Sequence, residues 1–297
     1  MPTGSAVVVG VDFSTCGATA LRQAVRIGSW SRSAVHAVHV IDTMALIELE
    51  SAFMTSAPDL HRYMTEEATR SWGRISADVP GAAGAKFHVA TDTPARGLAR
   101  AASEHAAWLL VVGAHGERAH AGAGVVASAC ARSAPCDVLL AAEGAAGPYK
   151  TIVVGIDFSE TSRRALERAM RIAAQDGAQV HAVHVYRAPW AGLHLRPAAL
   201  KDDPTGQARY RDMLREKLEA FCAPTDPEVT WTKPRFEVID SRGHGHGLAS
   251  YTRSSGADLV VLGTRGKTNV RDVLLGSTAE RVIRESPCSM LVVRPAE

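Results

Sequence analysis

Residues 7–40 read VVVGVDFSTCGATALRQAVRIGSWSRSAVHAVHV, and residues 152–185 read IVVGIDFSETSRRALERAMRIAAQDGAQVHAVHV. The two stretches align without a gap, and about half of their positions are identical. Two later pairs repeat the relationship: LLVVGAHG at 109–116 with LVVLGTRG at 259–266, and PCDVLL at 135–140 with PCSMLV at 287–292. Self-similarity of this kind is the sequence signature of a repeated structural unit. We therefore interpret the chain as a tandem duplication of one domain.

Each copy alternates apolar runs with helical patterns. Residues 7–11 form a nearly continuous β-branched run, which is typical of a strand covered on both faces of a parallel sheet, and apolar residues at helical spacing follow in 20–28. This alternation predicts an α/β fold of two tandem doubly wound (Rossmann-like) domains, each a five-stranded parallel sheet flanked by helices. Further strands are predicted at 35–40, 86–90, 109–112, 138–141, 180–185, 235–239, 259–262 and 290–293, and further helices at 59–78, 94–105, 205–222 and 247–255.

The segment 142–150, AEGAAGPYK, interrupts the pattern with glycine, alanine and proline. It predicts a first domain over 1–143 and a second over 149–297. Pairing of the two domains through their last predicted strands would remove two exposed sheet edges. The sequence therefore predicts an intrachain pseudo-dimer and leaves a homodimer open.

The composition excludes several classes of protein. With 297 residues, 46% of them hydrophobic and 22% charged, the chain is neither disordered nor fibrous. Its longest apolar run is about seven residues, against the roughly 18 of a membrane-spanning helix, and no secretory signal is evident, so we expect no membrane association and a cytoplasmic location. A net charge of +2 argues against nucleic acid as a partner. The five cysteines include no Cys-x-x-Cys pair, which favours idle thiols in a reducing compartment.

A glycine pattern follows the fourth strand of the second copy. Gly263 and Gly266 lie where the chain leaves the strand, and Gly276, Ser277 and Thr278 open the next helix. Exposed backbone N–H groups and a helix N-terminus favour phosphate, and ligands of doubly wound sheets bind at the carboxyl ends of the strands. Alternatively, these residues are ordinary turn and cap residues, with the hydroxyls serving as N-caps.

Three motifs of the second copy together resemble the universal stress protein family, specifically its ATP-binding branch. They are GIDFSET at 155–161, AVHV at 182–185 and Gly-x2-Gly-x9-Gly-Ser at 263–277. The resemblance covers both halves, so the chain is similar to a tandem member. It implies ATP as the ligand, with or without Mg²⁺.

The resemblance also implies roles for individual residues. Asp157, after Gly155 at the tip of the first strand, would contact the ribose or the adenine edge, and Val185 would offer backbone groups to adenine. Thr264 and Arg265 would line the loop, with Arg265 supplying charge to the phosphates or serving as a solvated surface residue. The remaining residues implied to hold ribose and phosphates are Gly263, Gly266, Gly276, Ser277 and Thr278.

The first copy departs from this pattern. Aligning Gly124 with Gly276 leaves seven residues after Gly116 where the second copy has nine, and Val125 and Val126 replace the two hydroxyl residues. His115 stands where the second copy has Arg265. We therefore expect weak or absent ATP binding at a second site whose matching residues are Gly10, Asp12, Val40, Gly113, Gly116 and Gly124.

Other site patterns fail on spacing. A Walker A loop ending at Gly266-Lys267-Thr268 would need glycine at position 261, which is Val261. The glycine-rich stretch 243–247, expected to be a flexible loop, lacks the last glycine of a dinucleotide fingerprint. His36/His39 and His181/His184 point to opposite faces of their strands, so neither pair holds a metal, and no metal site or catalytic residue is predicted.

The sequence favours an ATP-binding protein that acts as a nucleotide-linked regulator in the stress response. One alternative is an interaction or scaffold protein that works without nucleotide. The other is an enzyme that slowly hydrolyses ATP or phosphorylates itself at Ser277 or Thr278, although the sequence names no general base for that reaction.

Overall fold

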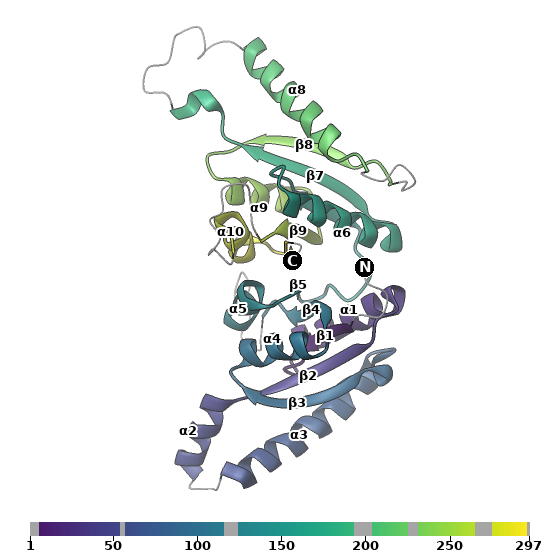
Figure 1. The fold of residues 1–297 in the computed structure, drawn as a ribbon, viewed down its shortest axis with the longest axis vertical. Coiled ribbons are helices and arrows are strands. Elements are labelled where there is room, and N and C mark those ends of the chain that lie inside the picture. The colour runs from purple at the N-terminus through teal and green to yellow at the C-terminus, as the bar shows by residue number, and fades with distance from the viewer. Residues whose placement is uncertain are drawn as a thin grey trace. The chain divides into compact units, whose positions relative to one another are not determined.

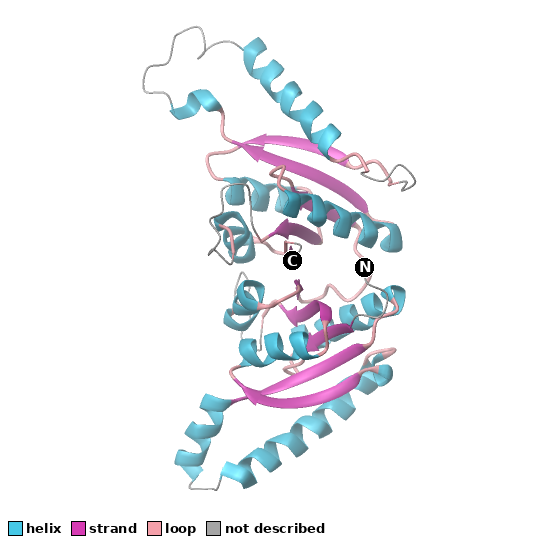
Figure 2. Cartoon of the chain, in the orientation of Figure 1, coloured by secondary structure: helices cyan, strands magenta, loops and turns pink. Residues whose placement is uncertain are grey.

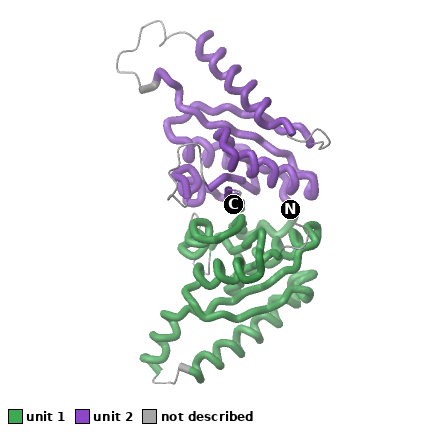
Figure 3. Tube along the Cα trace, viewed as in Figure 1, with its two compact units in different colours: residues 1–147, 289–291 green, residues 148–288, 292–297 purple. Residues whose placement is uncertain are grey.

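The computed structural model describes residues 6–53, 57–115, 124–192, 204–224, 231–264 and 275–295. The chain divides into two compact units: unit 1 comprises residues 1–147 and 289–291, and unit 2 comprises residues 148–288 and 292–297 (Figure 3). Strands and helices alternate along both copies of the repeat, as the sequence predicts (Figure 1, Figure 2). Among the described residues, no helix combines the length and apolar character needed to cross a membrane.

The first copy forms parallel strands in the order β3-β2-β1-β4-β5. This order reverses direction beside β1, as expected for a doubly wound sheet. Its elements are β1 (Ala6–Gly10), α1 (Thr15–Ser31), β2 (Val35–Asp42), α2 (Thr43–Phe53), α3 (Ala57–Asp78), η1 (Ala82–Gly84), β3 (Lys86–Asp92), α4 (Pro94–Glu104), β4 (Ala107–Gly113), α5 (Val125–Ser133) and β5 (Asp137–Ala141).

The second copy repeats the topology in the order β10-β9-β6-β7-β8. The pairings β6–β7, β6–β9 and β7–β8 are parallel, so the predicted fold class is confirmed. Its elements are β6 (Thr151–Gly155), α6 (Glu160–Asp176), β7 (Gln179–Tyr186), η2 (Pro189–Gly192), α8 (Pro204–Phe221), β8 (Arg235–Asp240), α9 (His244–Ser254), β9 (Leu259–Gly263), α10 (Ser277–Glu285) and β10 (Ser289–Val293).

Helices cover both faces of each set of strands. A Cβ added to Gly10 of β1 would meet Leu98 of α4, whereas one added to Gly113 of β4 would meet Cys16 of α1. Since these glycines end adjacent strands and face opposite sides, α1 and α4 lie on opposite faces. Val7, Val8 and Val9 are fully buried between the two layers, as the continuous apolar run predicts. The second copy repeats the close approaches with Gly155 against Leu248 of α9 and Gly263 against Thr161 of α6.

The helix predicted at 59–78 is confirmed as α3, but the sequence analysis missed α2 before it. Helix α2 has no buried residue and leaves Met44 and Phe53 exposed. One further local prediction is wrong. The glycine stretch 243–247 is not a loop, because α9 begins at His244. A Cβ on Gly247 would lie 2.8 Å from Val185 Cγ1, so glycine at that position allows the helix to pack closely.

Candidate functional site

The predicted residues of the second copy gather around a pocket of about 330 Å³ at the carboxyl ends of β6, β7 and β9. The N-terminal ends of α9 and α10 close it from the other side, through His244 and through Ser277. Arg265 and Gly266 lie outside the described residues. The predicted residues that line the pocket are Gly155, Asp157, Val185, Gly263, Thr264, Gly276, Ser277 and Thr278.

Asp157 links the end of β6 to the start of α6. Its Oδ1 accepts hydrogen bonds from the backbone N–H of Ser159 at 3.0 Å and from the Ser159 hydroxyl at 2.5 Å. Ser159 is the N-cap of α6, and its hydroxyl oxygen accepts from the N–H of Ser162 at 3.1 Å. Only one carboxylate oxygen is needed for these contacts within the described residues, which leaves Oδ2 available to a ligand in the pocket.

Phe158 has a φ of 63°, in the left-handed region that non-glycine residues rarely adopt. Its ring lies 4.5 Å from the ring of His184, centroid to centroid. Nδ1 of His184 lies 2.8 Å from the carbonyl oxygen of Ile156, and because a carbonyl only accepts, Nδ1 carries the proton. Burial lowers the pKa of His184 below its ordinary value of 6.5, although the bond to Ile156 opposes that shift, so the ring is neutral at pH 7. These contacts fix the turn that carries Asp157.

The start of α10 supplies hydrogen-bond donors to the pocket. Gly276, not Ser277 or Thr278, is the N-cap, and no side chain caps this helix. The first intrahelical bond runs from the N–H of Glu280 to the carbonyl of Gly276, so the N–H groups of the three preceding residues have no partner within the helix. Those N–H groups, the helix dipole and the hydroxyls of Ser277 and Thr278 suit an anionic ligand.

Thr264 lies at the same edge of the pocket, and its hydroxyl has no hydrogen-bond partner among the described residues. Its backbone is held on both sides, because its N–H donates to the carbonyl of Val293 and its own carbonyl accepts from the N–H of Gly276, both at 2.9 Å. The residue is fully buried, yet its Oγ1 has no hydrogen-bond partner in the described part of the chain. A buried hydroxyl without a partner costs about 1–3 kcal/mol, and a ligand oxygen that reached this hydroxyl would remove that cost.

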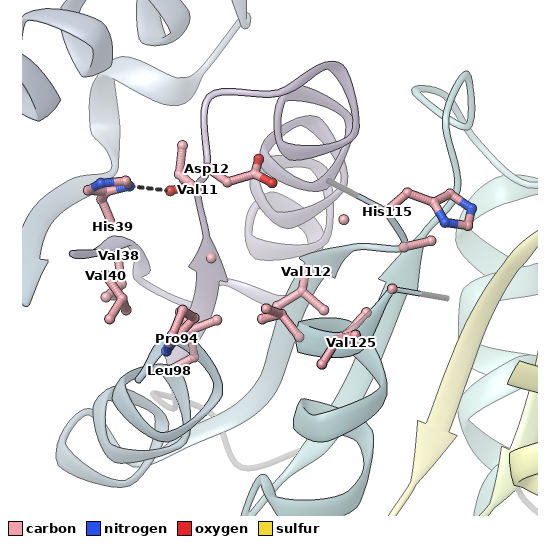
Figure 4. A pocket seen from close by; sticks show the side chains of 16 residues that line it. Val11, Asp12, Val38, His39, Val40, Pro94, Leu98, Val112, His115 and Val125 are labelled. Carbon is pink, nitrogen blue, oxygen red and sulfur yellow. Dashed lines mark hydrogen bonds between the residues drawn. The ribbon is translucent and has the colours of Figure 1, made fainter. Parts of the chain in front are cut away.

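Unit 1 has an equivalent pocket of about 260 Å³ (Figure 4). The Asp12 carboxylate binds Ser14, the N-cap of α1, and His39 Nδ1 lies 2.8 Å from the carbonyl oxygen of Val11, so the turn after β1 matches the turn after β6. Gly116 lies outside the described residues. The other residues predicted for the weaker site all line this pocket: Gly10, Asp12, Val40, Gly113 and Gly124.

Among the described residues, the unit 1 pocket lacks the three hydroxyl groups that Thr264, Ser277 and Thr278 give the unit 2 pocket. Gly124 is the N-cap of α5, and its N–H donates to the carbonyl of Ala114 at 2.7 Å, just as Gly276 donates to Thr264. Ala114 thus takes the place of the buried hydroxyl of Thr264. Val125 and Val126 stand at the first two helical positions and are 86% and 39% exposed. At these positions an apolar rim replaces the polar one of unit 2.

A sequence profile of the universal stress protein family matches residues 5–142 and again residues 148–294. The chain belongs to the universal stress protein family. It is 32% identical over 153 residues to the universal stress protein MJ0531 of Methanocaldococcus jannaschii, a match that covers 49% of this chain and 82% of that protein. It is 29% identical over 148 residues to a universal stress protein of Thermus aquaticus, covering 49% of this chain and 99% of that protein.

Solved structures agree with the tandem fold. A universal stress protein from Archaeoglobus fulgidus superposes with a TM-score of 0.62 at 20% sequence identity, covering 98% of both chains. A putative universal stress protein from Pseudomonas aeruginosa gives a TM-score of 0.61 at 19% identity, covering 99% of this chain and 93% of that one. At these identities the similarity concerns the fold.

Sequence reasoning missed several residues of the pocket in this universal stress protein. His244 and Leu248 contribute from α9, and His184 contributes from β7. The stretch that holds His244 follows β8, so the rule that ligands bind at the carboxyl ends of strands could have pointed to it. No pattern in the sequence singles out Leu248, since it is an ordinary apolar position of a helix.

Proposed function

We propose that this universal stress protein is a nucleotide-linked regulator in the stress response and that it binds ATP in the unit 2 pocket. The observation that carries the proposal is the buried hydroxyl of Thr264, which has no partner among the described residues, beside the N-terminus of α10, which no side chain caps. A triphosphate offers the oxygen acceptors that this hydroxyl and the helix N–H groups lack. The family membership supports the same assignment.

The residues of the pocket divide between the two ends of a nucleotide. On this proposal Asp157 contacts the ribose or the adenine edge through Oδ2, and the backbone of Val185 serves adenine. Gly263, Thr264 and Gly276 lie at the phosphate end together with Ser277 and Thr278. Arg265 and Gly266 belong to the same end by sequence.

The pocket of unit 1 binds ATP weakly or not at all on this proposal, since Val125 and Val126 offer no hydroxyl donors there. ATP bound to one conformation of unit 2 stabilises that conformation by RT ln(1 + [ATP]/Kd), about 2.7 kcal/mol when ATP is present at 100 times Kd. Such a shift changes the surface that the chain offers to protein partners. We propose a cytoplasmic location and an intrachain pseudo-dimer as parts of the same hypothesis.

Mass analysis of nucleotide released from freshly purified, denatured protein tests the function. We expect ATP, with an increase in melting temperature when ATP is added back to nucleotide-free protein. A protein that carries no nucleotide and shows no thermal shift with ATP would contradict the proposal and favour an interaction protein that works without nucleotide. Turnover of ATP above the buffer background, or phosphate on Ser277 or Thr278, would instead favour the enzyme.

A further inference from the structure

Three histidines of unit 1 lie close together in space. They are far apart in the sequence, so no local motif reveals them. They are His36 of β2, His88 of β3 and His105, the residue that caps the C-terminal end of α4. One ring nitrogen of each lies within 4.8 Å of the others. None of the three lines the unit 1 pocket.

The fold brings these side chains to one face of the sheet. In the parallel register of β2 and β3, His36 pairs with Lys86 and Val38 pairs with His88. His36 and His88 are therefore diagonal neighbours that point to the same side, which is the side of Val38 and Val40. A Cβ on Gly97 of α4 would meet Val40 at 2.9 Å, so α4 covers this face and its last turn delivers His105 to the pair.

The three rings are in direct contact. Nδ1 of His36 lies 3.0 Å from Nε2 of His88. The ring of His36 stacks on that of His105 with centroids 3.8 Å apart, and the rings of His88 and His105 lie 5.0 Å apart. His36 is 9% exposed, whereas His88 and His105 are half-buried. Solvent therefore reaches the cluster through His88 and His105, while His36 is shielded.

We propose that His36, His88 and His105 form a binding site for a divalent transition-metal ion of the zinc class. Zinc binds imidazole nitrogens at about 2.0–2.1 Å, so three nitrogens of a tetrahedral site lie roughly 3.4 Å from one another. The rings of His36 and His105 are stacked in the structure, with an angle of 24° between their planes. Binding of one ion by all three nitrogens therefore requires the His105 ring, at the end of its helix, to rotate out of this stack. Water takes the fourth position, since the described residues supply three ligands.

The chemistry of the ligands selects the metal. Neutral imidazoles favour Zn²⁺, Cu²⁺, Ni²⁺ and Co²⁺, while Mg²⁺ and Ca²⁺ require oxygen ligands. The site is thus separate in place and in ion preference from any Mg²⁺ that accompanies ATP in unit 2. It does not depend on the proposed nucleotide function.

Unit 2 provides an internal comparison, because the equivalent positions there are not three histidines. His181 pairs with Arg235 as His36 pairs with Lys86, so His88 corresponds to Glu237. The C-cap position of His105 in α4 is taken in α9 by Ser255. Both ring nitrogens of His181 already have partners, the Tyr251 hydroxyl at 3.1 Å and Gln179 Oε1 at 3.2 Å. Among the described residues, the cluster therefore occurs in unit 1 alone.

Titration of the full chain with Zn²⁺ tests the proposal, using protein without an affinity tag and freed of metal by a chelator. We expect one zinc per chain, and Co²⁺ in its place should give the visible absorption of a low-symmetry, nitrogen-bound ion. His105→Ala, at the half-buried position, should weaken zinc binding at least about 100-fold, since it removes one of three ligands. His61→Ala is the matched control, because His61 lies in α3 of the same unit, contacts Thr91 and belongs to no cluster of the described residues.

Circular dichroism checks that the H105A variant folds. If the variant does not fold, the anomalous diffraction of zinc in wild-type crystals tests whether the three histidines bind the ion. The expected peak lies within bonding distance of all three histidines. Equal zinc affinity of H105A and wild type, failure of the wild type to bind, or a peak elsewhere on the chain would each overturn the proposal. Equal loss in H61A would indicate adventitious binding to surface histidines and would overturn it as well.

Discussion

Replacement of Thr264 by valine is expected to stabilise the nucleotide-free protein while weakening its binding of ATP. Thr264 is fully buried, and its hydroxyl has no partner among the described residues. Valine has nearly the same shape, so the substitution removes an unsatisfied polar group without opening a cavity. Since an unmade hydrogen bond of this kind costs about 1–3 kcal/mol, the free energy of unfolding of unit 2 should rise by roughly 1–2 kcal/mol.

The same hydroxyl is expected to bind a phosphate oxygen when ATP is present. A hydrogen bond to a charged group is worth about 1.5–3 kcal/mol, so T264V should raise the Kd for ATP by roughly one to two orders of magnitude. Differential scanning calorimetry with and without ATP measures both effects. In a domain of this size each kcal/mol moves the melting temperature by about 2–4 °C. The variant should melt higher than wild type without ATP and gain less from added ATP.

Thr252→Val is the matched control for this substitution. Thr252 is also fully buried in unit 2, but its hydroxyl donates to the carbonyl of Leu248 at 2.9 Å. T252V should therefore be neutral or destabilising by up to about 1 kcal/mol, with unchanged affinity for ATP. The reasoning is refuted if T264V lowers the stability of the nucleotide-free protein and binds ATP as wild type does, because the hydroxyl would then have a partner within the protein.

Three further predictions concern the turn, the packing and the titration of unit 2. Asp157→Asn keeps the oxygen that accepts the hydrogen bond from Ser159 but loses the negative charge. The affinity for ATP, measured by calorimetry, should therefore fall about tenfold with little change in melting temperature. The matched control, Asp12→Asn in unit 1, should leave the affinity for ATP unchanged. Gly263→Ala places a Cβ 2.7 Å from Thr161 Cγ2 and should lower the free energy of unfolding, measured by urea denaturation, by about 1–3 kcal/mol. As the control, Gly73→Ala places its Cβ on the exposed side of α3 with no atom nearby, and should raise the free energy of unfolding by up to about 1 kcal/mol. Because burial lowers the pKa of His184 below its unfolded value of 6.5, its contribution to stability is present above pH 6.5 and is lost as the pH falls through the folded pKa. An NMR titration of the His184 ring checks this, and protonation at the unfolded value would contradict it.

The repeat made most of the fold predictable from sequence. Strands such as 7–11 and 259–262 are continuous apolar runs because both faces are covered, and that pattern has few alternative readings. Helix α2 escaped prediction because its apolar residues, Ile47 among them, are exposed and show no buried stripe. The glycines at the start of α9 led to the prediction of a loop. Gly247 is needed there because the helix packs closely against Val185 and Ser241, and no local sequence pattern indicates such a tertiary contact.

The candidate site was predictable where its residues follow strand ends. Asp157 and Gly263 do so, and the pocket brings them together. That the hydroxyl of Thr264 has no partner among the described residues could not be anticipated, because hydrogen bonding depends on neighbours from β10 and α10 that are distant in sequence. The same limit hid the histidine cluster. The spacing of His36 and His39 correctly separates their side chains, but the partners of His36 come from β3 and α4.

The central claim is that one ATP binds to each chain, in the pocket of unit 2. Isothermal titration of nucleotide-free protein with ATP measures the stoichiometry directly, with Ser277→Ala/Thr278→Val as the site variant and Val125→Ala/Val126→Ala as its counterpart in unit 1. We predict one site per chain, lost or strongly weakened in the unit 2 variant and unchanged in the unit 1 variant. An absence of binding, or a site abolished by the unit 1 substitutions and untouched by those in unit 2, would contradict the account.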